Sequence, residues 1–385
     1  MERKTKLGSV IEFTLKMLFL LVLIGADSSC KKDDDGNPPP PPPPTPDFFI
    51  RSVDLSFTPQ IAAYNVTYYA GDTAKPILQL VKDKSINTIR VRLWYAPADG
   101  HSSLSEVLDF AKQIKLAGLK FWLDIHYSDT WCDPAHQSKP AAWSTLNLDQ
   151  LKDSVFAYTK NVMTTLSQNN VTPDYVQIGN ETNNGMLWPE GQIYSSSGTN
   201  WNNFIELVEN GIAAVKEVSP STATMIHYAQ YQGADYYFGN LTTLTPDYDI
   251  IAISYYPPWH GKSIDSVQMM VSTLASQFGK PVVIAETAYP WTLGWNDWTN
   301  NVVGLPDQLI PDYPATPDGQ AAYLSALISA VKSAAGTDNF GVSYWAADWV
   351  AYKGTTATDG SSWENQALFD FQYKALPALD SLGKK

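Results

Sequence analysis

The chain has 385 residues, of which 26 are Lys or Arg and 39 are Asp or Glu, giving a formal net charge of −13 at pH 7. Because only 17% of the residues are charged and the balance is acidic, the chain lacks the positive field that holds a nucleic acid backbone, and we exclude nucleic acid as a partner. The 13 Trp and 21 Tyr residues supply more ring surface than a core of this size requires. We therefore expect some of these rings to line a binding cleft.

Residues 1–29 have the pattern of a secretory signal peptide. Basic residues from Arg3 to Lys16 precede the apolar run 17–24, which is too short to span a bilayer as a permanent helix. Cys30 follows at the position of the lipid-carrying cysteine of a lipoprotein. We predict that Cys30 is lipidated and anchors the protein to a membrane. The alternative is a secreted chain with a free Cys30.

Residues 30–46 are predicted to combine the lipidated cysteine, an acidic export tag and a proline stalk. The acidic cluster at 33–35 resembles the tag of lipoproteins displayed on the outer face of Gram-negative outer membranes. The seven prolines at 38–44 favour an extended, semi-rigid segment that rises about 3.1 Å per residue. A ligand for a proline-binding module is the alternative. The sequence thus predicts a cell-surface protein held off the outer membrane.

Residues 47–385 are expected to form a single domain, because no second linker-like segment interrupts them. Eight short apolar runs alternate with amphipathic stretches, which is the pattern of βα units with a parallel sheet. The predicted strands lie at 48–53, 88–93, 120–125, 175–178, 224–228, 250–255, 282–285 and 341–345. The clearest predicted helices lie at 104–116, 148–168, 201–218 and 320–334. Eight such units indicate an α/β fold of the (β/α)8 TIM barrel type.

In such a barrel the catalytic side chains lie at the C-terminal ends of the strands. Polar and aromatic residues close the predicted strands: Asp54, Arg92, Trp94, His126, Tyr127, Asn180, Glu181, His227, Tyr228, Tyr255, Tyr256, Glu286 and Trp345. A doubly wound nucleotide-binding sheet is disfavoured, because residues 51–60 after the first strand contain no glycine for a phosphate loop.

Glu181 and Glu286 each follow a buried apolar run on strands that face each other across the barrel. Retaining glycoside hydrolysis needs one protonated and one ionised carboxyl group about 5 to 5.5 Å apart, so this pair predicts a retaining glycosidase. Asn180 fits a donor to the sugar 2-hydroxyl. We expect Arg92 to orient Glu286 and to lower its pKa. For either glutamate alone, the alternative is a structural ion pair with Arg90 or Arg92.

Other strand-end residues are expected to contact a sugar. His126 is either a core histidine or a hydrogen-bond partner of the sugar, and Trp345 either stacks on a pyranose ring or packs in the barrel. Further ring residues are compatible with a groove of several subsites, which favours endo attack on a polymer: Trp94, Trp131, Trp259 and His260. The remaining expected substrate contacts are Asp54, Arg92, Asn180 and Tyr255.

Longer motifs closely resemble the endo-β-1,4-galactanases of glycoside hydrolase family 53. They are VRLW at 91–94, LDIHYSD at 123–129, QIGNETNNGMLWP at 177–189, SYYP at 254–257, ETAYP at 286–290 and WENQALFDF at 363–371. The resemblance implies that Glu181 is the general acid/base, that Glu286 is the nucleophile, and that the substrate is the β-1,4-galactan of type I arabinogalactan. Family members often read YWEPAW at the last strand, whereas this chain reads YWAADW at 344–349.

The resemblance implies no cofactor for the chemistry. Some bacterial members bind calcium in the loops after strands seven and eight, and here Asp297 and Asn300 offer oxygen ligands at 293–301. An ordinary polar loop is the alternative. A monomer is the expected state. Two other functions stay open: a β-mannanase or cellulase on the same barrel, and a surface glycan-binding lipoprotein without catalysis.

Overall fold

The computed structural model describes residues 49–244, 247–335 and 341–384, which all fall in the unit Asp47–Lys385. The predicted signal peptide, Cys30 and the proline-rich segment lie outside the described residues. In the described part of the chain, no helix has the length and apolar character needed to cross a membrane.

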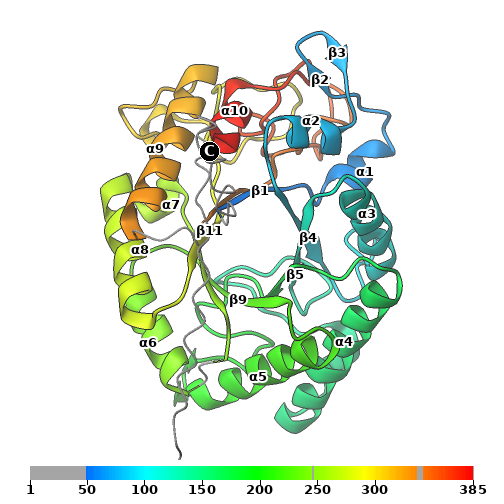
Figure 1. Ribbon diagram of the computed structural model, residues 1–385, viewed down its shortest axis with the longest axis vertical. Coiled ribbons are helices and arrows are strands. Elements are labelled where there is room, and N and C mark those ends of the chain that lie inside the picture. The colour runs from blue at the N-terminus through cyan, green and yellow to red at the C-terminus, as the bar shows by residue number, and fades with distance from the viewer. Residues whose placement is uncertain (1–48, 245–246, 336–340, 385) are drawn as a thin grey trace, which may run out of the picture. The chain divides into compact units, whose positions relative to one another are not determined.

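Eight parallel strands form a closed barrel, with sequential neighbours paired and the last strand paired to the first (Figure 1). The strands are β1 (Ile50–Asp54), β4 (Thr88–Leu93), β5 (Lys120–Ile125), β6 (Tyr175–Ile178), β9 (Ala223–Tyr228), β10 (Ile250–Ser254), β11 (Val282–Glu286) and β12 (Gly341–Tyr344). The predicted (β/α)8 barrel is confirmed. Its boundaries differ slightly, because β10 and β12 end one residue early and β11 extends through Glu286.

Helices surround the strands in chain order, and α10 packs against α9 and β1 to complete the ring (Figure 1). The outer helices are α2 (Ile77–Asp83), α3 (Leu104–Leu116), α4 (Leu148–Gln168), α5 (Trp201–Val218), α6 (Ala234–Leu244), α8 (Ile264–Phe278), α9 (Pro317–Ala335) and α10 (Pro377–Gly383). The predicted bounds of α3, α4 and α5 are confirmed, because cap residues and buried stripes mark them clearly. In α4, Asn147 and Gln150 form a reciprocal capping box.

Shorter elements occur in the loops between the strands and the outer helices. They are α1 (Thr58–Ala62), α7 (Pro257–His260), the hairpins β2 (Tyr69–Ala70) with β3 (Thr73–Ala74) and β7 (Tyr194–Ser195) with β8 (Gly198–Thr199), and the 3-10 turns at Ala141–Trp143 and Pro306–Gln308.

Two layers of buried side chains differ in polarity along the barrel strands. One cluster is apolar: Ile50, Trp122, Met225, Ile250, Ala252, Val283 and Ala285. Two residues after Trp122, Met225 and Ala252, the side chains are polar and equally buried: Asp124, His227 and Ser254. Other strands add the buried polar residues Asp54, Arg90 and Gln177. Because side chains on one face of a strand recur every two residues, the barrel changes from apolar to polar toward the C-terminal strand ends. The C-terminal end of the barrel therefore has a polar floor on which a site can form.

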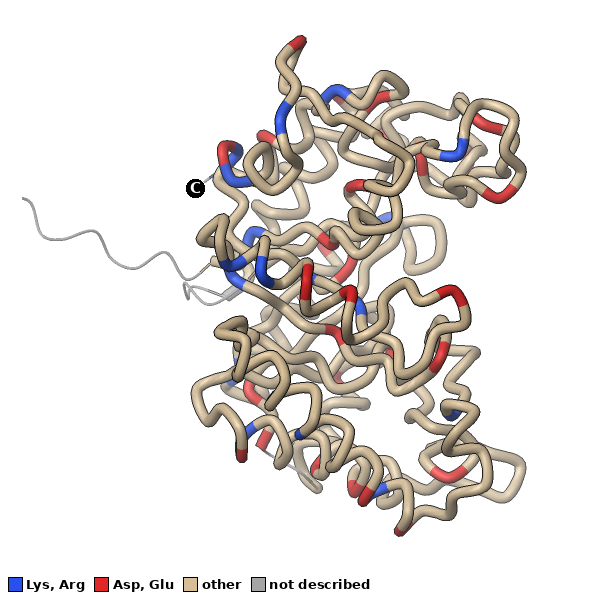
Figure 2. Tube along the Cα trace, turned by 90° about the vertical axis from the view of Figure 1, so that its right-hand side faces the viewer, with Lys and Arg blue, Asp and Glu red and all other residues tan. Residues whose placement is uncertain are grey.

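Charges on the described trace are sparse and mixed. Lys and Arg positions alternate with Asp and Glu positions, with uncharged stretches between them (Figure 2). This distribution agrees with the low charged fraction of 17% and offers no extended basic track.

Candidate active site

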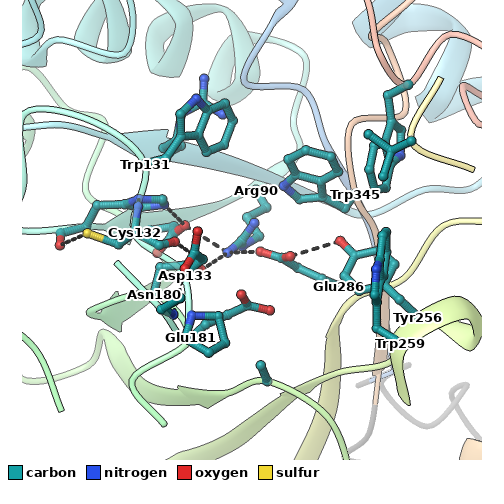
Figure 3. Close-up of a pocket in the computed structure, with 18 of the residues that line it drawn as sticks. Arg90, Trp131, Cys132, Asp133, Asn180, Glu181, Tyr256, Trp259, Glu286 and Trp345 are labelled. Atoms are coloured by element: carbon teal, nitrogen blue, oxygen red, sulfur yellow. Dashed lines mark hydrogen bonds and ion pairs between the residues drawn. The ribbon is translucent and has the colours of Figure 1, made fainter. Parts of the chain in front are cut away.

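A pocket of about 720 Å³ lies at the C-terminal ends of the barrel strands. Both predicted catalytic residues, Glu181 and Glu286, line it (Figure 3). The predicted substrate contacts that also line it are Arg92, His126, Asn180, Trp259, His260 and Trp345. The structure therefore brings eight of the eleven predicted catalytic and substrate-binding residues together in one cavity.

Glu286 ends β11, and each of its carboxylate oxygens has a partner. Oε1 lies 2.8 Å from Nη2 of Arg90, and Oε2 accepts a hydrogen bond of 2.9 Å from the hydroxyl of Tyr256. The prediction that Arg92 orients Glu286 is wrong, because Arg90 has this role. Arg90 lies one inward position deeper on β4, so its side chain reaches the carboxylates from below, whereas Arg92 lies at the mouth among aromatic rings.

Arg90 connects the buried acidic groups of the site. Its Nη1 lies 2.8 Å from Asp54 and its Nη2 lies 2.8 Å from Asp124 and 3.0 Å from Oδ1 of Asn180. Burial alone would lower the pKa of Arg90, but the surrounding carboxylates together raise it, so the guanidinium stays charged. A buried cation with several carboxylate partners gives Glu286 a fixed geometry and a counter-charge.

Glu181 follows β6 in a tight turn with left-handed backbone geometry. Its φ is +46°, and Gly179 two residues earlier has a φ of +77°. A Cβ at Gly179 would lie 2.7 Å from Cγ2 of Thr182, so a side chain there has no room. Backbone conformations of this kind concentrate at functional sites, and here the turn directs Glu181 into the pocket.

The two glutamates experience different electrostatic surroundings. Burial raises the pKa of Glu181, and the negative charge of Glu286 raises it further, against a lowering effect of the Ser254 hydroxyl. Burial also raises the pKa of Glu286, but the Arg90 cation 2.8 Å from Oε1 and the Tyr256 hydroxyl 2.9 Å from Oε2 oppose this rise and favour the ionised form. A proton shared by this pair therefore resides on Glu181, while Glu286 is the carboxylate.

Aromatic side chains line the pocket next to these carboxyl groups. Trp259 stacks on Trp363 with ring centroids 6.2 Å apart, and Trp345 meets Trp363 edge-on at 4.7 Å. Trp131 and Trp259 are 39% and 51% exposed, so part of each side chain is accessible to a ligand. The guanidinium carbon of Arg92 lies 4.1 Å from the Trp131 ring centroid. Flat, partly exposed rings of this kind suit pyranose stacking.

His126 and Asn180 use most of their polar atoms within the protein. His126 lies 2.9 Å from Asp124 through Nε2, and its Nδ1 accepts from the indole of Trp94 at 3.3 Å. Asn180 donates to the carbonyl of Cys132 at 2.9 Å, which leaves one amide hydrogen for a ligand. These residues border the pocket and also fix its floor.

Three predicted substrate contacts lie outside the pocket lining: Asp54, Trp94 and Tyr255. Asp54 lies beneath the site and holds Arg90, and Trp94 packs behind His126. Tyr255 follows the inward Ser254, so its fully buried side chain packs near Tyr323 instead. Arg90 and Ser254 are not among the site residues predicted from the sequence, and Tyr256 is named there only as a residue at a strand end. Strand alternation places Ser254 and Tyr256 on the same side of the chain.

The possible calcium ligands Asp297 and Asn300 do not form a cation cage. Asp297 is buried and accepts hydrogen bonds from the backbone amides of Thr299 at 2.7 Å and Ser361 at 3.3 Å, while Asn300 is exposed. Within the described ranges, no group of three or more His, Cys, Asp or Glu side chains is arranged to hold a metal. Since calcium takes six to eight oxygen ligands, these residues do not fit it.

Comparison with known proteins identifies the relatives of this chain. The profile of Glycosyl hydrolase family 53 matches residues 50–382. The arabinogalactan endo-beta-1,4-galactanase of Cellvibrio japonicus is 37% identical over 341 residues, which cover 86% of this chain and 89% of the relative. The endo-beta-1,4-galactanase of Bacillus subtilis is 29% identical over 374 residues, covering 86% and 84%. The solved catalytic domain of an Ignisphaera aggregans family 53 protein superposes with a TM-score of 0.83 at 38% identity, covering 88% and 97% of the two chains.

Proposed function

Because the chain belongs to glycosyl hydrolase family 53, we propose that it hydrolyses internal β-1,4-galactosidic bonds of type I arabinogalactan with retention of configuration. The names of the Cellvibrio japonicus and Bacillus subtilis relatives support the substrate. The observation that carries the chemistry is the pair Glu181 and Glu286, which line one pocket, with Glu286 alone in direct contact with a cation.

In the first step, the Glu286 carboxylate attacks the anomeric carbon, and Glu181 gives its proton to the departing glycosidic oxygen. The products of this step are a shortened galactan with a new hydroxyl group and a galactosyl ester on Glu286. Arg90 and Tyr256 hold the two oxygens of Glu286 in place for the attack. Their positive charge and hydroxyl donor also stabilise the carboxylate when it leaves later.

In the second step, the ionised Glu181 takes a proton from water, and the hydroxide attacks the anomeric carbon. The ester bond breaks, Glu286 recovers its negative charge, and Glu181 is protonated again. Two inversions at one carbon give net retention. Each glutamate thus ends the cycle in the state in which it began.

The pocket's aromatic residues are proposed to bind the galactosyl units around the scissile bond. Trp345 lies among the rings near Glu286, while the accessible parts of Trp131 and Trp259 would receive units further out. Arg92 has Nη1 and Nη2 atoms with no hydrogen-bond partner among the described residues, so it can donate to sugar oxygens. Binding on both sides of the cleavage point favours attack within a chain.

The test is reducing-end release by the purified domain 47–385 from linear β-1,4-galactan, with β-mannan and cellulose in parallel and the products sized by chromatography. Short galacto-oligosaccharides from galactan alone are expected. Activity only on mannan or cellulose would contradict the proposed substrate. Binding of galactan without hydrolysis would contradict the proposed catalysis and indicate a glycan receptor. Glu181→Gln and Glu286→Gln should each retain about 1% of the activity or less, which is a loss of about a hundredfold or more.

We also propose that the protein is a lipoprotein of the outer membrane, anchored through Cys30 and displayed at the cell surface, and that it acts as a monomer. The signal-like residues 1–29, the acidic cluster and the prolines support this proposal. Cys30→Ala should move the protein from the membrane to the soluble fraction of lysed cells. Persistent sedimentation with membranes would contradict the anchor, and light scattering of the released domain tests the monomer.

A further inference from the structure

We propose that Ser254 and His227 are positioning residues that hold Oε1 of Glu181, so that Oε2 carries the proton exchanged with the substrate. This inference rests on the proposed role of Glu181 as the acid/base. It concerns two buried side chains that border Glu181 behind the pocket and are not among its lining residues.

Ser254 ends β10 and is fully buried within the barrel. Its Oγ lies 2.6 Å from Oε1 of Glu181 and 2.8 Å from Nε2 of His227. A hydroxyl group has one hydrogen, so Ser254 can donate to only one of these neighbours. The distance of 2.6 Å fits a hydroxyl that donates to Oε1, and in that arrangement Ser254 accepts from His227.

The surroundings of His227 favour the same direction. Burial lowers the pKa of His227 well below its usual value, and Arg90 lowers it further, so the ring is neutral and carries one N–H. Two donors face Nδ1: Nε2 of Gln177 at 3.0 Å and the backbone N–H of Glu181 at 3.4 Å.

One acceptor also lies near Nδ1, the side-chain oxygen of Asn180 at 3.0 Å. That oxygen already accepts from Arg90 at 3.0 Å and from Gln177 at 3.1 Å. Gln177 Nε2 also lies 3.1 Å from the carbonyl oxygen of Gly179, and His227 Nδ1 at 3.0 Å is the nearest of its three acceptors. With the backbone N–H of Glu181 as a second donor, we assign Nδ1 as the acceptor of the ring and the hydrogen to Nε2.

These assignments give one directed chain of hydrogen bonds, from Gln177 to His227 to Ser254 to Glu181. Oε1 accepts the last hydrogen bond, so a second hydrogen on Oε1, directed at Ser254, would clash with the hydrogen of the Ser254 hydroxyl. The other carboxyl oxygen, Oε2, has no hydrogen-bond partner among the described residues, and the side chain lines the pocket. The chain thus places the transferable proton on the oxygen nearest the ligand and restricts rotation of the carboxyl group.

The opposite tautomer defines the competing state. If Nδ1 carried the hydrogen, Nε2 would accept from Ser254, and Ser254 would accept a proton held on Oε1 of Glu181. That proton would point away from the pocket and could not reach the leaving group. The tautomer of His227 therefore decides whether Glu181 is presented productively.

The experiment compares Ser254→Ala with Ser343→Ala. Ser343 is a buried serine on β12 whose Oγ has no hydrogen-bond partner among the residues that the structure describes, so it is a matched control for loss of a buried hydroxyl. Both variants are assayed on galactan, whose leaving group needs a proton, and on a dinitrophenyl β-galactobioside, whose leaving group does not. Both variants keep the charged and titratable groups that act on Glu181 and His227, so these groups do not cause a difference between the variants. They are Glu286, Arg90, Asp124, Asp133, His126 and His260.

Ser254→Ala should lower kcat/KM on galactan by about tenfold or more and leave kcat/KM on the aryl substrate within a few-fold of wild type. Loss of a donor to the ionised form raises the pKa of Glu181, so the basic limb of the pH profile should move to higher pH. Ser254→Thr, which keeps the hydroxyl, should restore part of the galactan activity. Ser343→Ala should resemble wild type in every assay.

Equal losses on both substrates with an unmoved basic limb would overturn the proposal and make Ser254 merely structural. Nitrogen-15 shifts of His227 in the folded domain give an independent result: a protonated Nε2 is expected, and a protonated Nδ1 would overturn the proposal. The proposed function is tested separately. Full activity of Glu181→Gln would show that Glu181 is not the acid/base, whatever the result for Ser254→Ala.

Discussion

Replacement of Tyr256 by Phe should weaken the nucleophile without changing its surroundings otherwise. The substitution removes the hydroxyl that donates to Oε2 of Glu286 at 2.9 Å and leaves the ring in place. A hydrogen bond to a charged group contributes about 1.5–3 kcal/mol, and a pKa unit corresponds to about 1.4 kcal/mol. The pKa of Glu286 should therefore rise by about 1–2 units.

Glu286 must be ionised to attack, so a higher pKa means that activity is lost at a higher pH during acidification. The acid limb of kcat/KM on galactan should move upward by about 1–2 pH units, because this limb reports the free enzyme. Tyr255→Phe is the matched control. The Tyr255 hydroxyl is buried, has no hydrogen-bond partner in the described part of the chain and lies outside the pocket lining. An acid limb of Tyr256→Phe that stays at the wild-type pH would refute the reasoning.

Three further predictions concern stability and metal content. Arg90→Met leaves three buried carboxylates without their cation, so urea denaturation should show a free energy of unfolding lower by about 3–5 kcal/mol, and an unchanged value would contradict the central ion-pair network. Gly179→Ala brings a Cβ to 2.7 Å from Thr182 at a backbone φ of +77°. It should lower the Tm more than Gly354→Ala, where φ is +97° but the added Cβ meets nothing within 4 Å. Equal falls in Tm would show that the contact with Thr182 is unimportant. Chelation of calcium should leave the Tm unchanged, because the carboxylate of Asp297 is occupied by backbone amides, and a fall of several degrees would contradict this account.

The fold was accessible from the sequence because each barrel element carries its own local signal. The strands are rich in apolar residues and buried on both faces, and helices such as α4 begin at a cap and follow a buried stripe. The small boundary differences matter most at β11, which includes Glu286, and at β10, which ends before Tyr255. These ends depend on backbone pairing with neighbours, which periodicity alone does not reveal.

The candidate site was partly accessible. Strand ends directed attention to Glu181, Glu286 and Asn180, and all three line the pocket. The choice between Arg90 and Arg92 was not accessible, because both point inward and only the stagger of the barrel decides which one lies beside Glu286. The hydrogen-bond chain through Ser254 likewise joins residues on three strands and has no signature within one of them.

The most direct test of the account is to trap the covalent intermediate. The domain is incubated with a 2-deoxy-2-fluoro β-galactobioside that carries a dinitrophenolate leaving group, and the digested protein is measured by mass spectrometry. The account predicts one added fluorinated galactobiosyl group on the peptide that contains Glu286, and no label in Glu286→Gln. A label on another residue, or turnover with inversion and no trapped ester, would contradict the assignment of Glu286 as the nucleophile of a retaining galactanase.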